Sequence, residues 1–587
     1  MNKKSINILL IYLSYDTGET GIEKKELQVG QLYLATVLKK KGYKVKLYSA
    51  IFPDLEEIIQ LIKEDNYNVI GFYTTSNTIH RVTTMINIIK DSYPSIYIFL
   101  GGPHATVLDK ETLLETRADL VMRHEAEYTF LEVMEYFYEH KGTLHEIKGI
   151  TWRKGEEIIR NPDREFIKDL DNLPVPDWHI LEGDIAKENL PYPSIITGRG
   201  CPFSCTFCFE GFTGNIGRMR SAEHVIKEID LLLNNWKVKY IKFVDDIFIL
   251  DSERVEKICS ALMERREKKY NFYWFCEARV DILENKTYLL EKMKKAGLAV
   301  LQIGVESGNQ HILDIYNKKI TLEQIEHVVR ECVKADLFCI AINVIIGGPF
   351  ETEETIKKTV DFVKKLIKLA PGRLICYNSL LTPYPGTEIY KNPEKFGLKI
   401  IDPSLKDGQT EETCSVESEH MNKYDIYRAK IYLQEEIYKT MIEEIDNITS
   451  KQIEDHFCLT EYGIKTPWYK LLSLDKGIKR YFNLLLPSLY RGIEDILPEE
   501  LGDWCPQRTY PMRYKDKRII LDRINGIVEL TEEESIIYKY SSGKLSLNEI
   551  IEILTKKLEK SEEELKEKML NFYKKMNKIY AIIFLRL

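Results

Sequence analysis

Three cysteines that lie close together are the residues in this chain best suited to do chemistry. Cys201, Cys205 and Cys208 have the spacing C-x3-C-x2-C and follow two glycines, Gly198 and Gly200. Cysteine thiolates are the ligands of iron–sulfur clusters. Three thiolates on a 4Fe-4S cluster leave one iron without a protein ligand, and an open position distinguishes catalytic metal sites from closed structural ones. The spacing therefore predicts a catalytic iron–sulfur cluster.

Two other interpretations of the three cysteines stay open. Zinc ribbons usually pair two C-x2-C knuckles, and no second knuckle exists in the sequence. Structural thiols buried in a core are a further alternative, because cysteine is often buried. The remaining cysteines stand singly, at positions 259, 276, 332, 339, 376, 414, 458 and 505. That distribution indicates a reducing compartment rather than a disulfide scaffold.

The composition is that of an ordinary globular protein of several domains. The 587 residues are 44% hydrophobic and 30% charged, with a net charge of -8, which argues against a surface built for nucleic acid. The apolar run from Ile6 to Leu13 is short and has no small-residue cleavage site after it, so we interpret it as a strand rather than a signal peptide. No apolar run approaches the roughly 20 residues of a membrane span. We therefore expect a cytoplasmic protein with neither nucleic acid nor membrane as partner.

Residues 1–150 predict an α/β domain with a doubly wound, Rossmann-like sheet. Short β-branched runs alternate with amphipathic stretches, which favours parallel strands joined by helices. The expected strands are Ile6–Tyr12, Lys44–Ser49, Val69–Tyr73, Ile96–Leu100 and Leu120–Met122, and the expected helices include Gln28–Lys41, Leu55–Glu64 and Thr78–Asp91.

Small and hydroxylic residues follow three of these strands. The loops are Thr74–Asn77, Gly101–Ala105 and Arg123–Glu127. Doubly wound sheets bind ligands beyond the carboxyl ends of their strands, and residues without bulky side chains let a ligand approach the backbone. The loops therefore predict a ligand site, although Gly-Gly-Pro after a strand is also found in plain tight turns.

A second α/β domain follows a proline-rich connector over residues 151–190. Residues 191–403 again alternate strand and helix, and they predict a six-stranded partial (β/α)6 barrel of the TIM type. Its first strand leads from Pro193 to Thr197, and the others are Tyr240–Val244, Phe272–Cys276, Val300–Val305, Phe338–Ile346 and Leu374–Leu381. The cysteine loop thus follows the carboxyl end of the first strand, where the active-site loops of such barrels lie.

Polar residues follow each of the other five barrel strands. They are Asp245-Asp246, Glu277-Ala-Arg279-Val-Asp281, Glu306-Ser307-Gly308, Gly347-Gly348-Pro349 and Thr382–Thr387. Any single carboxylate among them could be a solvated loop charge. Polar groups gathered at five strand ends around one metal loop form a site. Cys276 and Cys376 are also near strand ends, and one of them could face the cavity.

The run RGCPFSCTFC, from Arg199 to Cys208, closely resembles the signature of radical S-adenosylmethionine (SAM) enzymes. The resemblance implies that SAM chelates the open iron of a 4Fe-4S cluster and is cleaved reductively to a 5′-deoxyadenosyl radical, which abstracts a hydrogen atom from the substrate. It also implies a flavodoxin or ferredoxin-type electron donor. By the same likeness, SAM contacts come from Phe207, Asp245, Asp246, Arg279, Glu306, Ser307, Gly347 and Gly348.

The amino-terminal loops resemble the cobalamin-binding domain of the cobalamin-dependent branch of this superfamily. The likeness rests on the GGPHA loop and the HEAEYTF segment, and it implies cobalamin contacts from Thr75, Ser76, Gly101, Gly102, Pro103, His104 and Glu125. The chain departs from the pattern in lacking a D-x-H-x-x-G loop, so no cobalt ligand is assigned among His80, His104 and His124. Residues 1–200 contain no cysteine, which disfavours the two-cluster methylthiotransferases of the superfamily.

Two smaller domains are expected after the barrel. Residues 404–505 predict a helical domain with a long amphipathic stretch at Lys423–Asn447 and aromatic anchors at Trp468, Tyr469, Tyr481, Phe482 and Tyr490. Residues 506–587 predict a winged-helix-like module: a hairpin through Asn525-Gly526, followed by capping boxes that begin at Thr531, Ser546 and Ser561.

The last module resembles the peptide-recognition domain of ribosomal-peptide biosynthesis, which pairs a leader peptide against a strand edge. The likeness is carried by the run from Asp522 to Leu554. The module holds 17 Lys and Arg against 13 Asp and Glu from Gln507 onward, only mildly positive for a DNA-binding fold. A purely structural appendage is the alternative.

These features lead to one first hypothesis and two rivals. The first is a cobalamin-dependent radical SAM enzyme that modifies a ribosomally synthesised precursor peptide, by C-methylation at an unactivated carbon. A rival within enzymes is cobalamin-dependent oxidation, cyclisation or rearrangement without methyl transfer, on a peptide or small molecule. The rival from another class is a degenerate cobalamin or nucleic-acid sensor.

Overall fold

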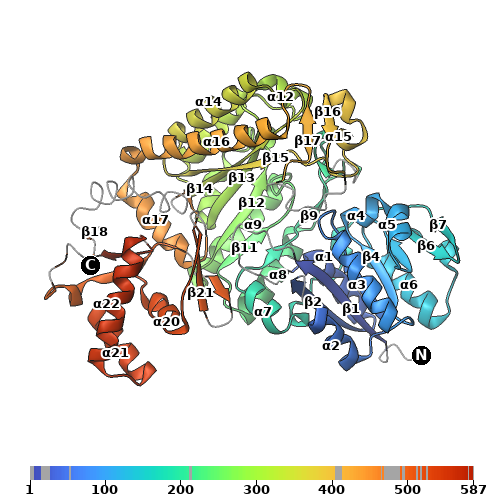
Figure 1. The fold of residues 1–587 in the computed structure, drawn as a ribbon, viewed down its shortest axis with the longest axis horizontal. Helices are drawn as coiled ribbons and strands as arrows, with labels where there is room; N and C mark the ends of the chain where they lie inside the picture. Colours follow the sequence, from blue (N-terminus) through green and yellow to red (C-terminus); the bar gives the residue numbers. More distant parts are fainter. Residues whose placement is uncertain are drawn as a thin grey trace.

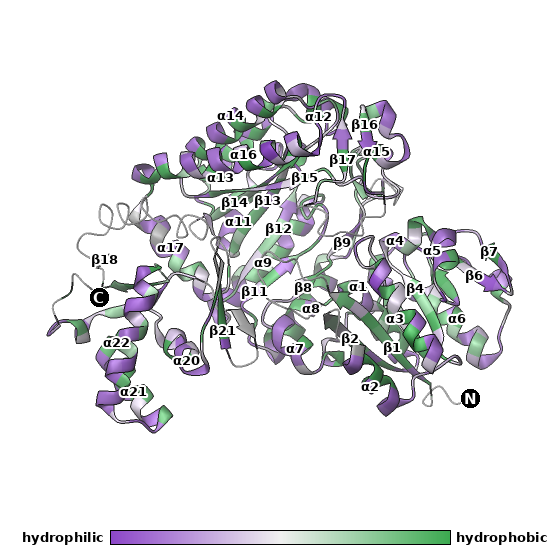
Figure 2. Cartoon of the chain, viewed as in Figure 1, coloured by the Kyte–Doolittle hydropathy of each residue, from purple (hydrophilic) through white to green (hydrophobic). Residues whose placement is uncertain are grey.

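The computed structural model describes residues 6–14, 27–51, 55–209, 214–403, 413–464, 466–467, 490–491, 493, 496, 498–510, 513–515, 518–523, 526–579 and 581–585. An amino-terminal α/β domain and a carboxy-terminal module lie on opposite sides of a central α/β domain (Figure 1). Figure 2 shows hydrophobic strands inside both large domains and hydrophilic outer faces on the helices that cover them. No helix among the described residues is long and apolar enough to cross a bilayer.

The amino-terminal domain is a doubly wound sheet with the strand order β2-β1-β3-β4-β5-β6-β7. Its first five strands are parallel. They are β1 (Asn7–Ser14), β2 (Lys44–Ile51), β3 (Val69–Tyr73), β4 (Tyr97–Gly101) and β5 (Leu120–Met122). The strand order reverses at β1, and ligands of such sheets bind beside that switch point. The predicted Rossmann-like fold is confirmed.

Helices cover both faces of this sheet because its strands are apolar on both sides. They are α1 (Val29–Lys40), α2 (Leu55–Asp65), α3 (Ile79–Ser92), α4 (Pro103–Val107), α5 (Asp109–Glu115) and α6 (Glu127–Glu139). Two separate apolar cores result, one around Leu10 and Leu32 and the other around Leu9 and Ile86.

The sheet continues beyond residue 150, into the stretch that the sequence assigned to the connector. β6 (Ile150–Lys154) and β7 (Glu157–Arg160) form an antiparallel hairpin, and β6 pairs with β5. The connector proper contains the 3-10 turns η3 (Leu170–Asn172) and η4 (Trp178–Ile180) and the helix α7 (Gly183–Asn189). Trp178 is fully buried there, and its indole donates a hydrogen bond to Glu228 at 2.9 Å. The connector therefore packs firmly against the next domain.

The central domain is a six-stranded parallel sheet with the sequential order β15-β14-β13-β12-β11-β8. The strands are β8 (Ser194–Ile195), β11 (Tyr240–Phe243), β12 (Tyr273–Ala278), β13 (Leu298–Glu306), β14 (Cys339–Ile346) and β15 (Leu374–Leu380). The edge strands β8 and β15 do not pair with each other within the described residues. The predicted partial barrel is confirmed.

Amphipathic helices pack on the outside of the barrel. They are α8 (Ala222–Asn235), α9 (Ser252–Lys268), α10 (Val280–Glu284), α11 (Leu289–Lys295), α12 (Gln310–Ile315), α13 (Leu322–Lys334) and α14 (Glu353–Leu369). The helix α16 (Lys423–Glu443), which the sequence placed in a separate helical domain, packs on α14 and β15. Its Ile426 and Leu433 join the barrel core. The helix α16 thus supplies the sixth helix of the (β/α)6 unit.

The amino-terminal end of the barrel is closed by an apolar cluster. Val300, Ala341 and Ile375 point into the barrel there and meet Leu459 of α17 (Ser450–Glu461). Cys339 belongs to the same cluster, whereas Cys276 and Cys376 belong to the core between strands and helices.

The alternative that Cys276 or Cys376 faces the cavity is therefore excluded. Successive side chains of a strand point to opposite faces, and both cysteines occupy the helix-facing phase of their strands.

Shorter elements connect the barrel to the carboxy-terminal module. They are α15 (Glu388–Lys391), η6 (Pro393–Phe396), the antiparallel pair β16 (Leu398–Ile400) and β17 (Val416–Ser418), η7 (Ile445–Asn447) and η9 (Leu501–Asp503). Of the predicted aromatic anchors, residues 468, 469, 481 and 482 lie outside the described residues.

Within its described residues, the carboxy-terminal module combines two small antiparallel sheets with three helices. One sheet joins β18 (Tyr490–Arg491), β23 (Ile582–Leu585) and β19 (Cys505–Arg508), and the other joins β20 (Arg513–Lys515), β21 (Arg518–Arg523) and β22 (Gly526–Glu529). The helices are α20 (Glu532–Tyr540), α21 (Leu547–Leu558) and α22 (Glu562–Lys578).

The hairpin and the three helices lie where the sequence predicted them. Thr531 and Ser546 form capping boxes with Glu534 and Glu549, and the Ser561 side chain caps α22. Asn525, in the predicted turn, lies outside the described residues.

Candidate active site

The cysteine loop is fixed at both ends by two short paired strands. β9 (Gly198–Arg199) and β10 (Arg218–Met219) are antiparallel, with Arg199 opposite Arg218. Gly200 has a φ of +77°, a conformation that favours glycine. It turns the chain out of β9 directly before Cys201.

The three thiols of the loop are reduced and half-buried. The Arg279 guanidinium lies 3.4 Å from the Cys205 sulfur and stacks on the Phe203 ring, 3.7 Å from its centroid. No three His, Cys, Asp or Glu side chains of the described chain converge on a point that one metal ion could occupy. A 4Fe-4S cluster needs no such point, because each thiolate binds a different iron. Three thiols beside a cation therefore fit a cluster.

Neighbouring barrel loops anchor the cysteine loop through backbone bonds. The Thr206 amide donates to the Tyr316 carbonyl at 3.0 Å, and the Thr206 carbonyl accepts from the Ile389 amide at 3.1 Å. The Asn317 side-chain amide donates to the Ser204 carbonyl at 2.9 Å. The cysteines are thus held over the carboxyl end of the barrel, as the barrel topology predicts.

A cavity of about 500 Å³ separates the cysteine loop from the amino-terminal sheet. The sheet side contributes residues of β1, β3, β4 and β5, and the barrel side contributes β9, β10 and the residues that follow β11. Among its lining residues are Leu10, Gly71, Phe99, Gly101, Gly102, Pro103, His124, Glu125, Glu127, Phe130, Arg199, Gly200, Arg218, Val244 and Asp246. One space is therefore shared by the two predicted cofactor regions.

The sheet side of the cavity fits a large ligand with many polar groups. Gly102 has a φ of +97°, and a Cβ there would lie 2.5 Å from the Thr74 carbonyl oxygen, so only glycine keeps this wall of the cavity open. Glu127 Oε2 and Arg218 Nε are buried without a hydrogen-bond partner in the described structure. Unpaired buried polar atoms are uncommon in native proteins. The amides at the rim of cobalamin offer both the donors and the acceptors that these two atoms lack.

Known proteins match both halves of this arrangement. Residues 195–363 match the family model of the radical SAM superfamily, and residues 22–134 match that of the B12 binding domain. The uncharacterized methyltransferase PH0819 of Pyrococcus horikoshii is 30% identical over 369 residues, which cover 62% of this chain and 77% of that protein.

The chain belongs to the radical SAM superfamily, in the branch that carries a B12 binding domain. It is an enzyme of this superfamily, with a 4Fe-4S cluster, SAM and cobalamin as its cofactors.

Other relatives and solved structures agree with this assignment. An anaerobic magnesium-protoporphyrin IX monomethyl ester cyclase of Rubrivivax gelatinosus is 27% identical over 399 residues. The aligned residues cover 66% of this chain and 70% of the cyclase. The cobalamin-dependent SAM radical enzyme OxsB, with aqua-cobalamin and SAM bound, superposes with a TM-score of 0.62 at 17% identity. The superposition covers 98% of this chain and 84% of the OxsB chain, and it shows that the two proteins share a fold.

In this radical SAM enzyme, polar side chains line the barrel beside the cysteine loop. Lys318 and Glu306 form a buried ion pair of 2.6 Å, and Arg279 donates to the Lys318 carbonyl at 2.6 Å. Burial lowers the pKa of Lys318, but Glu306 and the nearby Cys205 outweigh it, and the net shift is upward. Glu277 is half-buried at the end of β12, and burial together with Glu306 raises its pKa to about 7.

Four predicted SAM contacts lie around this ion pair or in the neighbouring loops. Phe207 packs edge-on against Tyr316, with 4.9 Å between the ring centroids. Ser307 bonds the Thr359 hydroxyl at 3.1 Å. The Gly347 and Gly348 amides both donate to Glu351, at 2.7 and 2.9 Å. A Cβ on Gly348 would lie 2.0 Å from the Tyr316 hydroxyl, so the glycine lets these two loops meet.

The two adjacent aspartates at the end of β11 have different surroundings. Asp245 is buried, and its carboxylate accepts from the Thr197 amide at 2.6 Å and from the Thr197 hydroxyl. Burial raises the pKa of Asp245, while the nearby Arg254 and these hydrogen bonds lower it, and the net shift is upward. Asp246 lines the shared cavity. Asp245 therefore positions the residue that precedes β9, whereas Asp246 is the one of the two that lines the cavity.

The predicted cobalamin residues divide in a similar way. Gly101, Gly102, Pro103 and Glu125 line the cavity. Thr75, Ser76 and His104 form the layer next to it: Ser76 bonds His104 Nδ1 at 3.1 Å, and Thr75 bonds the Thr78 hydroxyl at 3.1 Å. Burial lowers the pKa of His104 to about 4, so its imidazole is neutral near pH 7.

Glu125 does not face the cavity as a free carboxylate, because it bonds two arginines to which the sequence analysis assigned no role. It lies 3.2 Å from Arg199 and 2.9 Å from Arg218. Arg199 belongs to the same RGC run as Cys201, whereas Arg218 has no motif that would mark it. Lys318 was also missed, since it follows a short helix and belongs to no motif.

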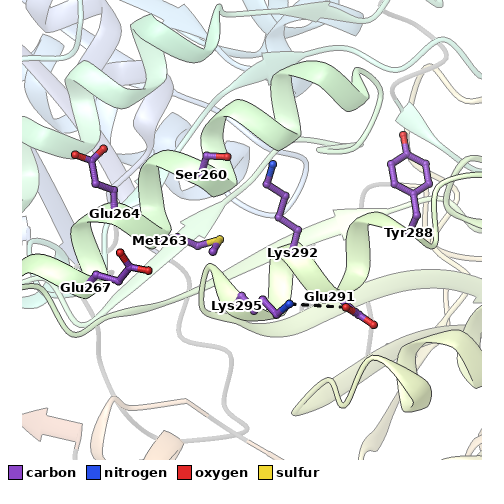
Figure 3. A pocket seen from close by; sticks show the side chains of 8 residues that line it. All are labelled: Ser260, Met263, Glu264, Glu267, Tyr288, Glu291, Lys292 and Lys295. Carbon is purple, nitrogen blue, oxygen red and sulfur yellow. Dashed lines mark ion pairs between the residues drawn. The ribbon is translucent and has the colours of Figure 1, made fainter.

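Another hollow, of about 490 Å³, lies on the outer surface between α9 and α11 (Figure 3). Figure 3 shows charged side chains around it, among them Glu264, Glu267, Lys292 and Lys295, and an ion pair of 3.8 Å between Lys295 and Glu291. It contains none of the predicted site residues. Since its walls are solvated charges, it is no candidate for the catalytic site.

Gly102→Ala is expected to weaken cobalamin binding at least about tenfold, because the new Cβ collides with the Thr74 backbone in a conformation that costs non-glycine residues about 1–3 kcal/mol. Gly101→Ala is the matched control, since its Cβ would meet only the Met122 carbonyl oxygen, at an ordinary 3.6 Å. Equilibrium titration with hydroxocobalamin measures both. Equal affinities for the two variants would contradict the assigned cavity wall.

Proposed function

We propose that this enzyme transfers a methyl group from SAM, by way of cobalamin, to an unactivated carbon of a ribosomally synthesised precursor peptide. The observation that carries the proposal is the single cavity lined by both cofactor domains. The relative PH0819 is named a methyltransferase, which supports methyl transfer. The relative from Rubrivivax is named a cyclase, so ring formation without methyl transfer is the second candidate.

The bound cofactors supply a 5′-deoxyadenosyl radical and a methyl donor, while the protein binds, orients and excludes water. Leu10, Phe99 and Phe130 give the shared cavity an apolar wall on the sheet side. On the barrel side, Val244 and Asp246 face it from the end of β11. A substrate carbon held between these walls would meet both cofactors in one water-poor space. Radical SAM enzymes need an electron donor, and we propose a flavodoxin or ferredoxin-type protein for this role.

The polar residues of the barrel suit the methionyl end of SAM, which carries one ammonium and one carboxylate. Glu277, half-buried and in no ion pair among the described residues, offers a carboxylate to the ammonium. Lys318 and Arg279 offer positive charge to the carboxylate, and both lie close to Cys205. A bound ammonium would also restore the charge of Glu277, because an opposite charge lowers the pKa of a carboxyl group.

SAM binding is therefore expected to strengthen as the pH rises from 6 to 8. With a pKa of about 7 in the free enzyme, Glu277 is mostly protonated at the lower pH and mostly ionised at the higher one. If only the ionised form binds the ammonium, affinity should rise about tenfold across this range. Isothermal titration calorimetry of the cluster-loaded enzyme with SAM measures the change.

Glu277→Gln provides the comparison for this pH profile. The amide keeps the size of the side chain and cannot ionise, so affinity should be lower and nearly constant between pH 6 and 8. A profile for Glu277→Gln that rises as steeply as that of the unmodified enzyme would assign the titration to another group.

The carboxy-terminal module supports a peptide as substrate. β22 is an edge strand of its sheet and is followed by three capped helices, α20 to α22. An edge strand offers backbone groups to which a peptide can add as a further strand. Together with the resemblance of residues 522–554 to peptide-recognition domains, this edge strand is the proposed docking site of a leader sequence.

The module lies at the end of the barrel opposite to the cysteines. Arg508 of β19 bonds Glu461 of α17, and the charges of both affect Lys239, which directly precedes β11. The strand β14 has eight residues, so the barrel is on the order of 26 Å deep at 3.3 Å per residue. A peptide docked on the module would need at least roughly eight extended residues before the modified position.

The proposal is tested with reconstituted holoenzyme, a reductant and SAM that carries a deuterated methyl group. Candidate substrates are short peptides encoded beside the gene and, in parallel, tetrapyrroles and other small molecules. A peptide product that contains the deuterated methyl group supports the proposal. A modified product without deuterium favours oxidation or cyclisation, and turnover of small molecules alone would exclude the peptide.

A further inference from the structure

Four charged side chains join the amino-terminal domain to the cysteine loop. Glu125 and Glu127 belong to the segment that leads into α6, and Arg199 and Arg218 belong to β9 and β10. Arg199 bonds Glu125 at 3.2 Å and Glu127 at 2.7 Å. Arg218 bonds both oxygens of Glu125 at 2.9 Å and the Ile167 carbonyl at 2.8 Å. We call these four residues the interdomain clamp.

The clamp grips the cysteine loop at both of its ends. Arg199 precedes Cys201 by two residues, and Arg218 lies opposite Arg199 in the paired strand. Any shift of Glu125 or Glu127 relative to the barrel must therefore move β9 and β10 or break their ion pairs. These contacts transmit the position of the sheet directly to the three cysteines.

The four side chains of the clamp are shielded from water, so their ion pairs contribute to the stability of the folded protein. Its side chains are only 4 to 14% exposed. The Arg199 guanidinium covers the Tyr33 ring, and that of Arg218 covers the Phe166 ring, each 5.0 Å from the centroid. Two positive and two negative charges balance. Removing one of them would leave an uncompensated buried charge, which is strongly destabilising.

Two polar atoms of the clamp lack hydrogen-bond partners within the described structure, and this indicates a ligand. Glu127 Oε2 and Arg218 Nε are buried, lack partners within the described structure, and belong to residues that line the shared cavity. One is an acceptor and the other a donor. A ligand rim rich in primary amides satisfies both, since an amide has N–H groups and a carbonyl oxygen.

We propose that the interdomain clamp couples cobalamin occupancy to the position of the cluster loop, with corrin amides completing its unpaired groups. Arg199, Arg218 and Glu127 are positioning residues in this role. By thermodynamic reciprocity, whatever fixes the cluster loop also tightens cobalamin. The inference rests on the cofactors of the family and is independent of the peptide substrate.

Hydrogen exchange with mass spectrometry tests the coupling in the full chain, with hydroxocobalamin as the probe. Cobalamin should slow exchange in residues 201–208, which do not line the shared cavity, at least about threefold in the unmodified protein. In Arg199→Gln this protection should disappear, and the cobalamin dissociation constant should rise at least about tenfold. Arg199→Lys, which keeps the charge but loses the guanidinium that bridges two carboxylates, should recover part of both effects.

Arg265→Gln is the matched control, because Arg265 bonds Asp230 through two contacts of 2.6 Å on the outer helices. It should leave cobalamin affinity and loop protection unchanged. If Arg199→Gln fails to fold by circular dichroism, Glu127→Gln replaces it, since the amide is nearly isosteric and keeps one acceptor oxygen. Protection of residues 201–208 that survives in the folded clamp variant would overturn the proposal.

Discussion

Cys201→Ala abolishes SAM cleavage on the arrangement described here, while cobalamin binding remains. Three thiolates hold the cluster, and each binds its own iron, so two thiolates cannot keep it in place. Production of 5′-deoxyadenosine should fall below detection, and the iron and sulfide content should fall with it. Cobalamin should still bind, because the sheet side of the cavity is unchanged, but more weakly than to the unmodified enzyme, since the interdomain clamp couples the cysteine loop to the corrin.

Cys458→Ala is the control for this loss. Cys458 is exposed and bonds only the Tyr273 hydroxyl, at 3.3 Å, among the contacts described. This variant should retain the cluster and full SAM cleavage. A Cys201→Ala protein that still forms 5′-deoxyadenosine would remove the cysteine loop from the reductive step, and the sensor hypothesis would then return.

Lys318→Met is expected to have the second largest effect, on stability and on SAM binding together. The substitution leaves the Glu306 carboxylate buried without its partner at 2.6 Å. Breaking a buried ion pair from one side costs about 3–5 kcal/mol. The unfolding transition of the barrel, followed by calorimetry, should move to a lower temperature, and SAM binding should be lost in calorimetric titration.

The double variant Lys318→Met with Glu306→Gln separates the two parts of this effect. Neutralising both partners removes the uncompensated charge, so most of the lost stability should return. SAM binding should not return, since the cation proposed for its carboxylate is still missing. Recovery of SAM binding in the double variant would show that Lys318 serves only the fold.

The fold could be predicted from the sequence because its signals are local. β3 and β5 are short apolar runs between polar turns, and their bounds agree with the predicted Val69–Tyr73 and Leu120–Met122. The hairpin β6–β7 was missed, since Arg153 and Arg160 interrupt its apolar pattern. α16 was assigned to another domain, because periodicity shows that a helix has an apolar face but not which surface covers it.

The site could be predicted only where one motif carries the chemistry. The spacing of Cys201, Cys205 and Cys208 is enough to identify them as cluster ligands. The glycines of the Gly101-Gly102 turn are identified by their residue type. The partners of Glu125 could not be predicted, because Arg218 lies 93 residues away and reaches it only through the packing of two domains. Asp245 and Asp246 look equivalent in sequence, and only the fold shows that one is buried under Thr197 while the other faces the cavity.

The shared cavity is tested most directly by electron paramagnetic resonance of one preparation that holds both cofactors. Cobalamin in its Co(II) state and the reduced cluster are both paramagnetic. If the two bind on opposite walls of the cavity between β9 and the amino-terminal sheet, each should broaden the signal of the other and shorten its relaxation time. A spectrum equal to the sum of the two separately loaded enzymes would contradict a common site.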